Sequence, residues 1–433
     1  MPAKAKPKST LAKVDLKREM THAGYNVRHN LITNDFEVVG LDKYQEDAAA
    51  FLPTILYELL SDAYKKASKQ NIIDYLAVIA RDNAYNPVLD LITAEPWNGV
   101  DSFLAIYKAL KIPKDDELSR TLIKKWFMQG AALLQNGSVD PFGADGCLVL
   151  IGGQGIGKTT FFRKASMSGV HLQGKYFRDG QTISDKDKDT KRRCITTWIC
   201  ELGEIGSTFK SDVDSLKAFI TSEYDEYRLP YGRTDKKAPR RTNLCGTAND
   251  TDEDAGYLVD ITGNRRFWTV HVKNIDLEAI NAIDFLQVWR QAYSLIKSNI
   301  HAFRLDKREQ EELENRNANH MKPTKGMGEV EDILFDAILD NPDDYRWEYL
   351  STTAWKMKHD ALKHMDRVVV GRAISAAIKI NPELTEKKCD KGIELLSEKS
   401  ERQEGKPTKV RYLPIDEKKE REEALKSVGG FRR

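Results

Sequence analysis

The chain has 433 residues, of which 68 are lysine or arginine and 66 are aspartate or glutamate, so its net charge is +2. This length exceeds one ordinary hydrophobic core and predicts several domains. No stretch approaches the roughly 20 apolar residues that a membrane-spanning helix needs, and no apolar segment of the kind found in signal peptides follows the basic N-terminus. We therefore expect a cytoplasmic globular protein, in which any nucleic-acid binding depends on local basic clusters.

The first 140 residues are predicted to form a tail and a helical domain. Residues 1–20 are rich in lysine, proline, serine and alanine, a composition typical of a disordered basic tail. Within residues 21–140, apolar side chains recur at helical spacing over 48–66, 72–80 and 122–134. We expect residues 21–140 to form an all-α domain.

Residues 141–320 carry the pattern of an α/β fold. Short apolar runs over 147–151, 194–200, 243–247 and 266–272 are typical of buried strands, and the segments between them favour helices on the faces of a sheet. Amphipathic helices are predicted over 279–297 and 307–316. The five cysteines show no paired C-x-x-C spacing, so we interpret them as reduced core residues, and the histidine spacing indicates no structural metal.

Residues 326–415 form a separate predicted domain. Helical patterns over 330–339, 353–362 and 368–378 precede a short strand pattern over 409–413. Three helices followed by a β element favour a winged helix. The mixed-charge residues 416–433 are expected to form a flexible tail.

A phosphate-binding loop follows the first strand of the α/β domain. The sequence after residues 148–151 reads G-x-x-x-x-G-K-T and leads into a helix, the order that the Walker A motif requires. Its backbone N–H groups would wrap the phosphates, Lys158 would reach the β and γ oxygens, and the Thr159 hydroxyl would bind Mg²⁺. The candidate nucleotide-binding residues are Gly152, Gly153, Gln154, Gly155, Ile156, Gly157, Lys158, Thr159 and Thr160.

Two acidic residues follow the second predicted strand. Phosphoryl transfer needs one group that holds Mg²⁺ through its water shell and another that orients or deprotonates the attacking water. Glu201 and Glu204 are the candidates for these roles, and the sequence leaves their division open. We take Thr159 and Glu201 as the candidate Mg²⁺ contacts.

A basic segment with interleaved aromatic residues spans residues 227–241. Such a mixture can hold the phosphates of a nucleic-acid strand and stack on its bases. The alternative is a solvated basic hairpin that contacts only water. The candidate DNA-binding residues are Tyr227, Arg228, Tyr231, Arg233, Lys236, Lys237, Arg240 and Arg241.

Three further polar residues lie at strand ends. Asn249 ends the strand pattern that begins at residue 243, where an amide could bind the γ-phosphate or the attacking water. Arg265 and Arg266 directly precede an apolar strand, and an arginine supplied to a neighbouring subunit's phosphate would stabilise the transition state. Alternatively, these two arginines form structural salt bridges.

Residues 86–268 resemble the virulence-associated protein E family, ATPases of phages and mobile islands that are related to superfamily 3 helicases. The resemblance rests on ordered motifs. They are Asn86-Pro87-Val88, Pro96-Trp97-Asn98-Gly99, the phosphate loop, Glu201-Leu202-Gly203-Glu204, Lys217-Ala218-Phe219, Asp225 with Arg228, Tyr231-Gly232-Arg233, Gly246-Thr247-Ala248-Asn249, and residues 260–268. The chain departs from the family at Asn98, where an aspartate is common, and at Ala248, where a threonine is common.

The resemblance implies an AAA+-type ATPase core that binds ATP and Mg²⁺. In it, Asn249 is similar to a sensor residue, Arg265 or Arg266 to an arginine finger, and Lys236 and Lys237 to the DNA-contacting hairpin inside a ring. We therefore expect a homohexameric, ATP-hydrolysing translocase or helicase on single-stranded DNA, without primase activity, that acts in replication of a phage or mobile genetic island. The alternative is a replication initiator or regulator that uses ATP as an assembly switch and binds duplex origin DNA through its C-terminal domain.

Overall fold

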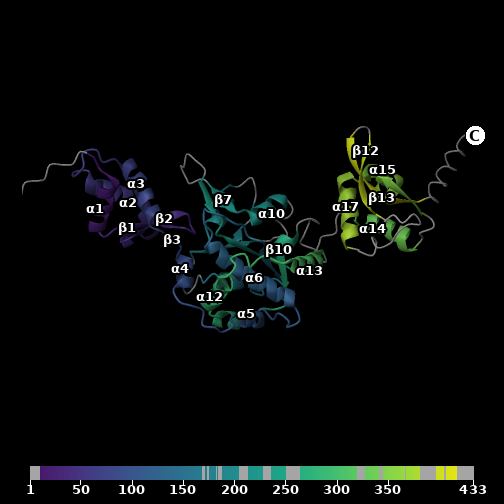
Figure 1. Cartoon of the computed structure of the whole chain (residues 1–433), viewed down its shortest axis with the longest axis horizontal. Helices are drawn as coiled ribbons and strands as arrows, with labels where there is room; N and C mark the ends of the chain where they lie inside the picture. Colours follow the sequence, from purple (N-terminus) through teal and green to yellow (C-terminus); the bar gives the residue numbers. More distant parts are fainter. Residues whose placement is uncertain are drawn as a thin grey trace, which may run out of the picture. The chain divides into compact units, whose positions relative to one another are not determined.

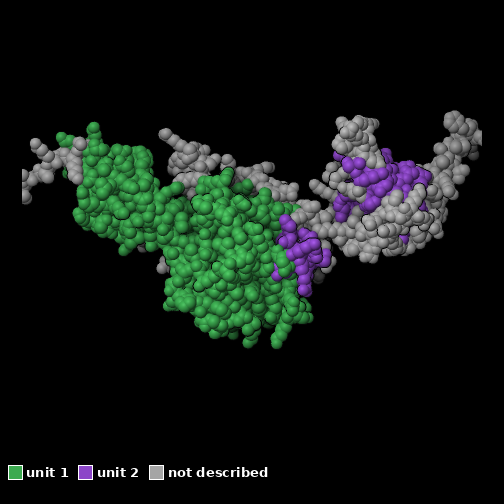
Figure 2. Space-filling model, viewed as in Figure 1, with its two compact units in different colours: residues 1–249, 266–306 green, residues 250–265, 307–433 purple. Residues whose placement is uncertain are grey.

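The computed structural model describes residues 10–167, 171–172, 175–181, 183, 188–203, 213–227, 236–249, 264–318, 327–340, 345–365, 367–380, 396–403 and 406–416. The chain divides into two compact units, one of residues 1–249 with 266–306 and one of residues 250–265 with 307–433 (Figure 2). Among the described residues, no helix has the length and apolar character that crossing a membrane requires.

The N-terminal part of the first unit is a mixed α/β module (Figure 1). Its sheet has the order β2-β1-β3, with an antiparallel β1–β2 pair and a parallel β1–β3 pair. Leu16, Val27, Leu52 and Leu56 are fully buried in its core. The elements are α1 (Lys13–His22), β1 (Asn26–Asn30), β2 (Asp35–Val39), a 3-10 turn (Asp42–Asp47), α2 (Ala48–Leu60), α3 (Lys69–Asp82) and β3 (Ala84–Tyr85).

Two expectations for this region are wrong. The domain of residues 21–140 is not all-α, because β1, β2 and β3 form a sheet within it. These strands are short and carry polar residues, so their sequence lacks the apolar run that marks a buried strand. The tail predicted for residues 1–20 also ends earlier, because α1 begins at Lys13 and buries Leu16 and Met20.

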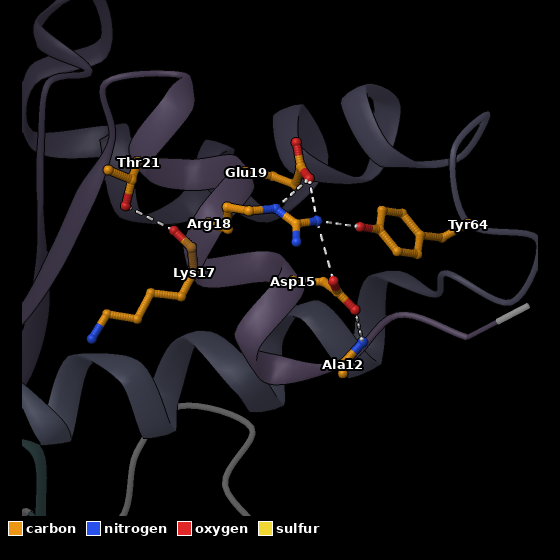
Figure 3. A network of polar contacts seen from close by, with 7 residues as sticks. All are labelled: Ala12, Asp15, Lys17, Arg18, Glu19, Thr21 and Tyr64. Carbon is orange, nitrogen blue, oxygen red and sulfur yellow. Dashed lines mark hydrogen bonds and ion pairs between the residues drawn. The ribbon is translucent and has the colours of Figure 1, made fainter. Parts of the chain in front are cut away.

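A polar network fixes α1 to the segment that follows α2 (Figure 3). The Arg18 Nη2 donates to Asp15 Oδ1 at 3.2 Å, to Glu19 Oε1 at 2.8 Å and to Tyr64 Oη at 3.2 Å. Asp15 Oδ2 in turn accepts from the backbone N–H of Ala12 at 3.4 Å. One arginine thus links two acids of α1 to a buried tyrosine 46 residues along the chain.

Helices α4 (Pro87–Thr93), α5 (Phe103–Ala109) and α6 (Glu117–Leu134) come before the main sheet in sequence. Asn86 caps α4 by accepting from the N–H of Leu89, with proline at the first helical position. Trp126 of α6 donates from Nε1 to the backbone oxygen of Leu244 at 2.8 Å, which places α6 against the sheet. The helices expected in residues 21–140 therefore belong to two cores, one in the N-terminal module and one around the sheet.

The main sheet has five parallel strands in the order β10-β4-β9-β6-β5. They are β4 (Cys147–Gly152), β5 (Phe177–Gln181), β6 (Ile199–Leu202), β9 (Asn243–Asn249) and β10 (Phe267–His271). A parallel sheet with helices confirms the predicted α/β class for this region. The strand expected over 194–200 is shorter, because Cys194 and Ile195 lie in a helix and β6 begins at Ile199.

The helices of this unit include α7 (Lys158–Ala165), α8 (Lys188–Ile195), α10 (Val213–Thr221), α11 (Leu277–Ala282) and α12 (Phe285–Leu295). Aromatic contacts of Trp126 with Phe162 and with Trp289 pack α6 against α7 and α12. Outside the sheet, β7 (Tyr224–Tyr227) and β8 (Lys236–Pro239) form an antiparallel pair. Four cysteines (Cys147, Cys194, Cys200 and Cys245) are free and buried, as expected, whereas Cys389 lies outside the described residues.

The second unit contains a helical segment and a three-stranded antiparallel sheet in the order β11-β13-β12. Trp355 is fully buried and donates from Nε1 to the backbone oxygen of Pro414 at 2.7 Å, which joins a helix to the sheet. The elements are α13 (Lys307–Ala318), α14 (Met327–Phe335), a π-helical turn (Asp336–Asp340), β11 (Tyr345–Leu350), α15 (Thr352–Lys358), α16 (Asp360–Lys363), α17 (Arg367–Ile380), β12 (Glu398–Gln403) and β13 (Lys406–Asp416). The sequence pattern did not predict β11, which lies between α14 and α15.

Candidate nucleotide-binding site

The predicted phosphate loop lies at the carboxyl edge of the parallel sheet, between β4 and α7. Gly155 and Gly157 have φ angles of 79° and 101°, which favour glycine. A Cβ atom at Gly157 would lie 2.6 Å from Leu277 Cδ2, and one at Gly152 would lie 2.1 Å from the backbone oxygen of Val272. Backbone conformation and close packing therefore both require glycine in this loop.

Lys158 begins α7 and is held under the loop. Only 6% of its surface is exposed, and Nζ donates to the backbone oxygens of Gly152 and Gly153, each at 2.7 Å. It also donates to Asn249 Oδ1 at 3.1 Å. Burial lowers the pKa of Lys158, and the nearby charge of Glu201 acts in the opposite direction. Three acceptor oxygens thus fix the position of the Lys158 ammonium group beside the loop.

Strand register explains why Asn249 reaches this lysine. Asn249 is the last residue of β9 and lies opposite Gly152, the last residue of β4. Parallel strands place their carboxyl ends at one edge of a sheet, so the two residues meet there. The structure therefore brings the predicted sensor residue to the predicted loop.

Glu201 lies in β6, with 2% of its surface exposed. Its Oε1 accepts from Thr159 Oγ1 at 2.7 Å and from Thr247 Oγ1 at 3.0 Å. Its Oε2 is buried and has no hydrogen-bond partner among the residues that the structure describes. Burial raises the pKa of Glu201, whereas the hydrogen bonds from Thr159 and Thr247 act to lower it.

Thr247 was not among the predicted functional residues. It precedes Asn249 by two positions in β9, and residues two apart on a strand share a face. The two-residue spacing from Asn249 could have identified Thr247 in the sequence, because a residue on the same strand face as the predicted sensor also points toward the site. Thr247 helps to fix the carboxylate of Glu201 beside Thr159.

The residues at this position fit a magnesium ion. Mg²⁺ prefers oxygen ligands and commonly binds one or two carboxylates with a threonine hydroxyl and substrate phosphates. Thr159 Oγ1 and Glu201 Oε1 are 2.7 Å apart, and the unpartnered Glu201 Oε2 offers a second oxygen beside them. A cation held at this position would satisfy a carboxylate oxygen that has no donor within the described part of the protein.

An ion pair outside the predicted motifs links α7 to β5. Arg163 Nη2 contacts Asp179 Oδ2, and both side chains are about half exposed. The charge of Asp179 raises the pKa of Glu201, and that of Arg163 lowers it. The pair therefore forms part of the electrostatic surroundings of the buried carboxylate.

The two predicted arginines lie beside β10. Arg265 and Arg266 belong to a 3-10 turn (Asn264–Arg266) that directly precedes this strand. Arg265 is exposed and donates from Nη1 to Gln310 Oε1 at 3.4 Å. Arg266 is half-buried, and its Nε has no hydrogen-bond partner within the described ranges. Among the described residues, the hydrogen-bond partner of Arg265 is thus a neutral amide, whereas a structural salt bridge would require a carboxylate.

Part of the predicted DNA-binding segment lies outside the described residues. Arg228, Tyr231 and Arg233 are in this group, and Glu204, the second candidate catalytic acid, also lies outside the described residues. Tyr227 and Lys236 pair in the backbone register at the end of the β7–β8 hairpin. Lys237 is exposed, with Nζ 4.1 Å from the centroid of the Tyr224 ring and 3.9 Å from Glu226 Oε1.

Arg240 does not lie on an exposed strand-binding surface, contrary to the expectation from its sequence context. Its surface is 0% exposed, and its Nε donates to Asp225 Oδ1 at 2.6 Å, which forms a buried ion pair with this residue of β7. The desolvation cost of a buried arginine requires such a partner, which the sequence pattern did not reveal. Burial raises the pKa of Asp225, and Arg240 acts to lower it.

Arg241 is also held by the protein. Its Nη2 donates to the backbone oxygen of Asn136 at 2.8 Å, and its Nη1 to that of Leu31 at 3.4 Å. These contacts connect the segment after β8 to the residues that follow α6 and to the N-terminal module. Arg241 is half-buried, and its role as a DNA contact stays a prediction.

Comparisons with known proteins give one family and several distant structural likenesses. No curated protein matches the chain. An apo structure of the NrS-1 C-terminal region (305–718) has a TM-score of 0.45 and 11% identity, and covers 95% of this chain and 100% of that chain. A structure of the A form of that region has a TM-score of 0.43 and 12% identity, with 92% and 98% coverage. A structure of JCV helicase with a bound compound has a TM-score of 0.27 and 11% identity, with 62% and 82% coverage.

The family profile of the virulence-associated protein E-like domain matches residues 92–322, which is more than half of the chain. The match begins in α4 and includes the loop, Glu201, Asn249 and both arginines. The chain belongs to the virulence-associated protein E-like domain family.

Proposed function

We propose that the chain hydrolyses ATP at the carboxyl edge of its parallel sheet, with Mg²⁺, and uses the energy to move along single-stranded DNA. The observation that carries the ATPase proposal is the convergence of two hydrogen-bonded pairs on one loop. Lys158 meets Asn249, and Thr159 meets Glu201. These residues are the cation, amide, hydroxyl and carboxylate that phosphoryl transfer uses.

The side chains have separate tasks in this proposal. Lys158 turns from the backbone oxygens of Gly152 and Gly153 to the phosphate oxygens, which are stronger acceptors because they are charged. That movement releases Asn249 Oδ1, so the side-chain amide can turn and donate from Nδ2 to the γ-phosphate or the attacking water. Bound Mg²⁺ supplies positive charge that balances the phosphates.

Glu201 and Thr159 would hold that cation, directly or through its water shell. The unpartnered Oε2 of Glu201 is the oxygen available for this contact. Its raised pKa also suits proton acceptance from water, so the division of roles between Glu201 and Glu204 stays as open as in the sequence. A nucleotide-binding assay of Glu201→Gln separates the two roles, because loss of a metal contact weakens Mg²⁺-dependent binding and loss of a base does not.

We propose that the active form is a homohexameric ring. An arginine from one subunit would reach the phosphates of the next, which makes hydrolysis depend on assembly. Exposure favours Arg265 for this task over the half-buried Arg266. The test measures ATP turnover per subunit at several protein concentrations, with sizing of the same samples. We expect turnover to rise with concentration in wild-type protein but not in Arg265→Ala.

Single-stranded DNA is the proposed track, and replication of a phage or mobile island the proposed setting. The β7–β8 hairpin supports this, because Lys237 is exposed there beside the Tyr224 ring. A basic and aromatic surface of this kind binds strands without sequence preference. ATP turnover with and without single-stranded DNA is the experiment that tests the proposal.

A second candidate function has one observation in its favour. The second unit has the order α14, β11, α15, α16, α17, β12 and β13, with an antiparallel sheet, which is the order of a winged helix. We propose this assignment for residues 326–415, with α17 as the helix that contacts duplex DNA and Arg367 exposed at its start. An origin-binding initiator that uses ATP as an assembly switch would bind duplex DNA tightly and hydrolyse ATP slowly.

Duplex binding by the full chain distinguishes the two functions. Under the initiator function, Arg367→Ala weakens binding to duplex DNA by about tenfold, in the range for one lost contact to a base pair. Lys307→Ala, at an exposed position of α13, is the control. Equal binding by both variants, together with strong stimulation of turnover by single-stranded DNA, favours the translocase.

A further inference from the structure

A cavity of about 650 Å³ lies between α8, α10 and the β7–β8 hairpin. Its volume is within the range of about 300–1,000 Å³ that is usual for small-molecule sites. None of its described lining residues belongs to the phosphate loop, and Glu201 and Asn249 do not line it. Its wall includes Lys191, Phe219, Tyr224, Glu226, Lys237 and Arg240.

Arg240 provides the strongest indication of a ligand. Its Nε is occupied by Asp225, but Nη1 and Nη2 are buried and have no hydrogen-bond partner in the part of the chain that the structure describes. A guanidinium group has five N–H donors, so most of its donor capacity is unused. Buried donors of this kind are rare in native proteins, and a bound ion or ligand is one established explanation. Arg240, one of the lining residues, therefore has two buried nitrogens for which the described part of the protein supplies no acceptor.

Two aromatic rings of the same cavity each lie beside a cation. The guanidinium carbon of Arg240 lies 4.5 Å from the centroid of the Phe219 ring, and Lys237 Nζ lies 4.1 Å from that of Tyr224. Cations bind phosphate, and aromatic rings stack on bases, which is the combination that binds single-stranded nucleic acid. A nucleotide carries both a phosphate and a flat base.

The charges of the wall limit the ligand further. Lys191, Lys237 and Arg240 are balanced by Glu223, Asp225 and Glu226, all of which line the cavity. Several negative charges, as on a triphosphate, would be repelled by the three carboxylates at short range. A phosphodiester or a monophosphate adds fewer negative charges to this balanced wall than a triphosphate does. The wall therefore favours a phosphodiester or a monophosphate over ATP.

We propose that this cavity binds one nucleotide unit with a single phosphate. The phosphate accepts from Nη1 and Nη2 of Arg240, and the base lies against Tyr224. Because Arg240 is shielded from solvent, binding requires the side chains around it to move aside. The inference rests on the proposed function where single-stranded DNA supplies the unit; a free nucleoside monophosphate is the other source.

The test uses a variant that fills the cavity and leaves the ion pair intact. Ala218 lines the cavity from α10 and is exposed, so Ala218→Trp places a large side chain in that space. Ala105→Trp, at an exposed position of α5 outside the cavity, is the matched control. Fluorescence anisotropy with labelled oligothymidine measures strand binding, and calorimetry with thymidine monophosphate measures binding of the free nucleotide, both without ATP.

Arg240→Lys is a second variant, which keeps a positive charge near Asp225 and removes the two terminal nitrogens. We expect Ala218→Trp and Arg240→Lys to weaken binding about tenfold, as for loss of one stacked base, while Ala105→Trp binds like wild-type protein. A loss seen only with oligothymidine identifies a strand as the source. A loss seen with the monophosphate identifies the free nucleotide.

Two results would overturn the proposal. One is a folded Ala218→Trp protein that binds both ligands as tightly as Ala105→Trp. The other is wild-type protein that binds neither ligand. ATP turnover without DNA is measured on the same samples. If wild-type protein binds a ligand but shows no turnover, and Ala218→Trp weakens that binding, the proposed ATPase is rejected and the cavity assignment stands.

Discussion

Lys158 donates a hydrogen bond from Nζ to Asn249 Oδ1 across 3.1 Å, although 91 positions separate the two residues in sequence. The bond joins the start of α7 to the end of β9, and the register that places Asn249 opposite Gly152 makes it possible. Two predicted catalytic residues therefore meet within the protein's own fold. A phosphate that draws Lys158 away would also release Asn249.

Replacement of the loop lysine should abolish ATP turnover. Lys158→Ala removes the ammonium group that contacts the loop at Gly152 and Gly153, and the loss of one such electrostatic contact typically costs about 100-fold or more in turnover. Lys164→Ala is the control, because Lys164 is an exposed residue of the same helix. Phosphate release by the purified proteins provides the measurement. Turnover in Lys158→Ala equal to that of the control would remove this lysine from the mechanism.

The pH profile of turnover should report on Glu201. Because burial raises the pKa of Glu201, the ionised form is lost at a higher pH than for an ordinary glutamate, and turnover should decline there as the pH falls. The hydrogen bond from Thr247 lowers this pKa, so Thr247→Val should move the acid limb to higher pH and reduce turnover by up to about tenfold.

Thr196→Val is the control for Thr247→Val. Thr196 donates to the backbone oxygen of Arg192 at 2.9 Å, away from the carboxylate of Glu201. An acid limb that stays in place in Thr247→Val, or that moves equally in both variants, contradicts the assignment of this limb to Glu201.

The two ion pairs of the hairpin should differ strongly in their effect on stability. Asp225 and Arg240 are buried, and loss of one partner leaves the other charge uncompensated, so Asp225→Ala should lower the free energy of unfolding by about 3–5 kcal/mol. Glu226→Ala breaks an exposed contact of 3.9 Å with Lys237 and should cost at most about 1 kcal/mol. Chemical denaturation of both variants tests the contrast. Similar losses of unfolding free energy in the two variants would show that the buried pair stabilises the protein no more than the exposed pair does.

Stimulation by DNA should depend on the lysines of β8. In the combined variant Lys236→Ala and Lys237→Ala, we expect the ratio of turnover with single-stranded DNA to turnover without it to approach one, because two phosphate contacts are lost. Lys164→Ala again serves as a comparison that removes a lysine elsewhere. A ratio equal to that of wild-type protein would place the DNA contact elsewhere.

Much of the nucleotide site could be predicted because its signals are local. The loop glycines, Lys158 and Thr159 are adjacent in sequence, and strand ends located Glu201 and Asn249. The role of Thr247 could have been inferred from strand periodicity, since it precedes Asn249 by two residues.

Other features depend on tertiary contacts that local patterns do not contain. Arg240 looks like a surface cation in a basic segment, and only its pairing with Asp225 in the folded hairpin shows that it is buried. The strands β1 and β2 have five residues each, and Val27 is the one apolar residue of β1, so neither strand shows the apolar run that marked the strands of the main sheet. In both cases the deciding partner lies elsewhere on the chain.

The most direct test of the central claim is ATP hydrolysis by the purified chain, with and without single-stranded DNA, with sizing and Lys158→Ala measured in parallel. We predict turnover that single-stranded DNA strongly stimulates in a ring-sized species and that Lys158→Ala abolishes. Turnover that is absent, or that DNA leaves unchanged while the protein still binds ATP, would contradict the proposed translocase.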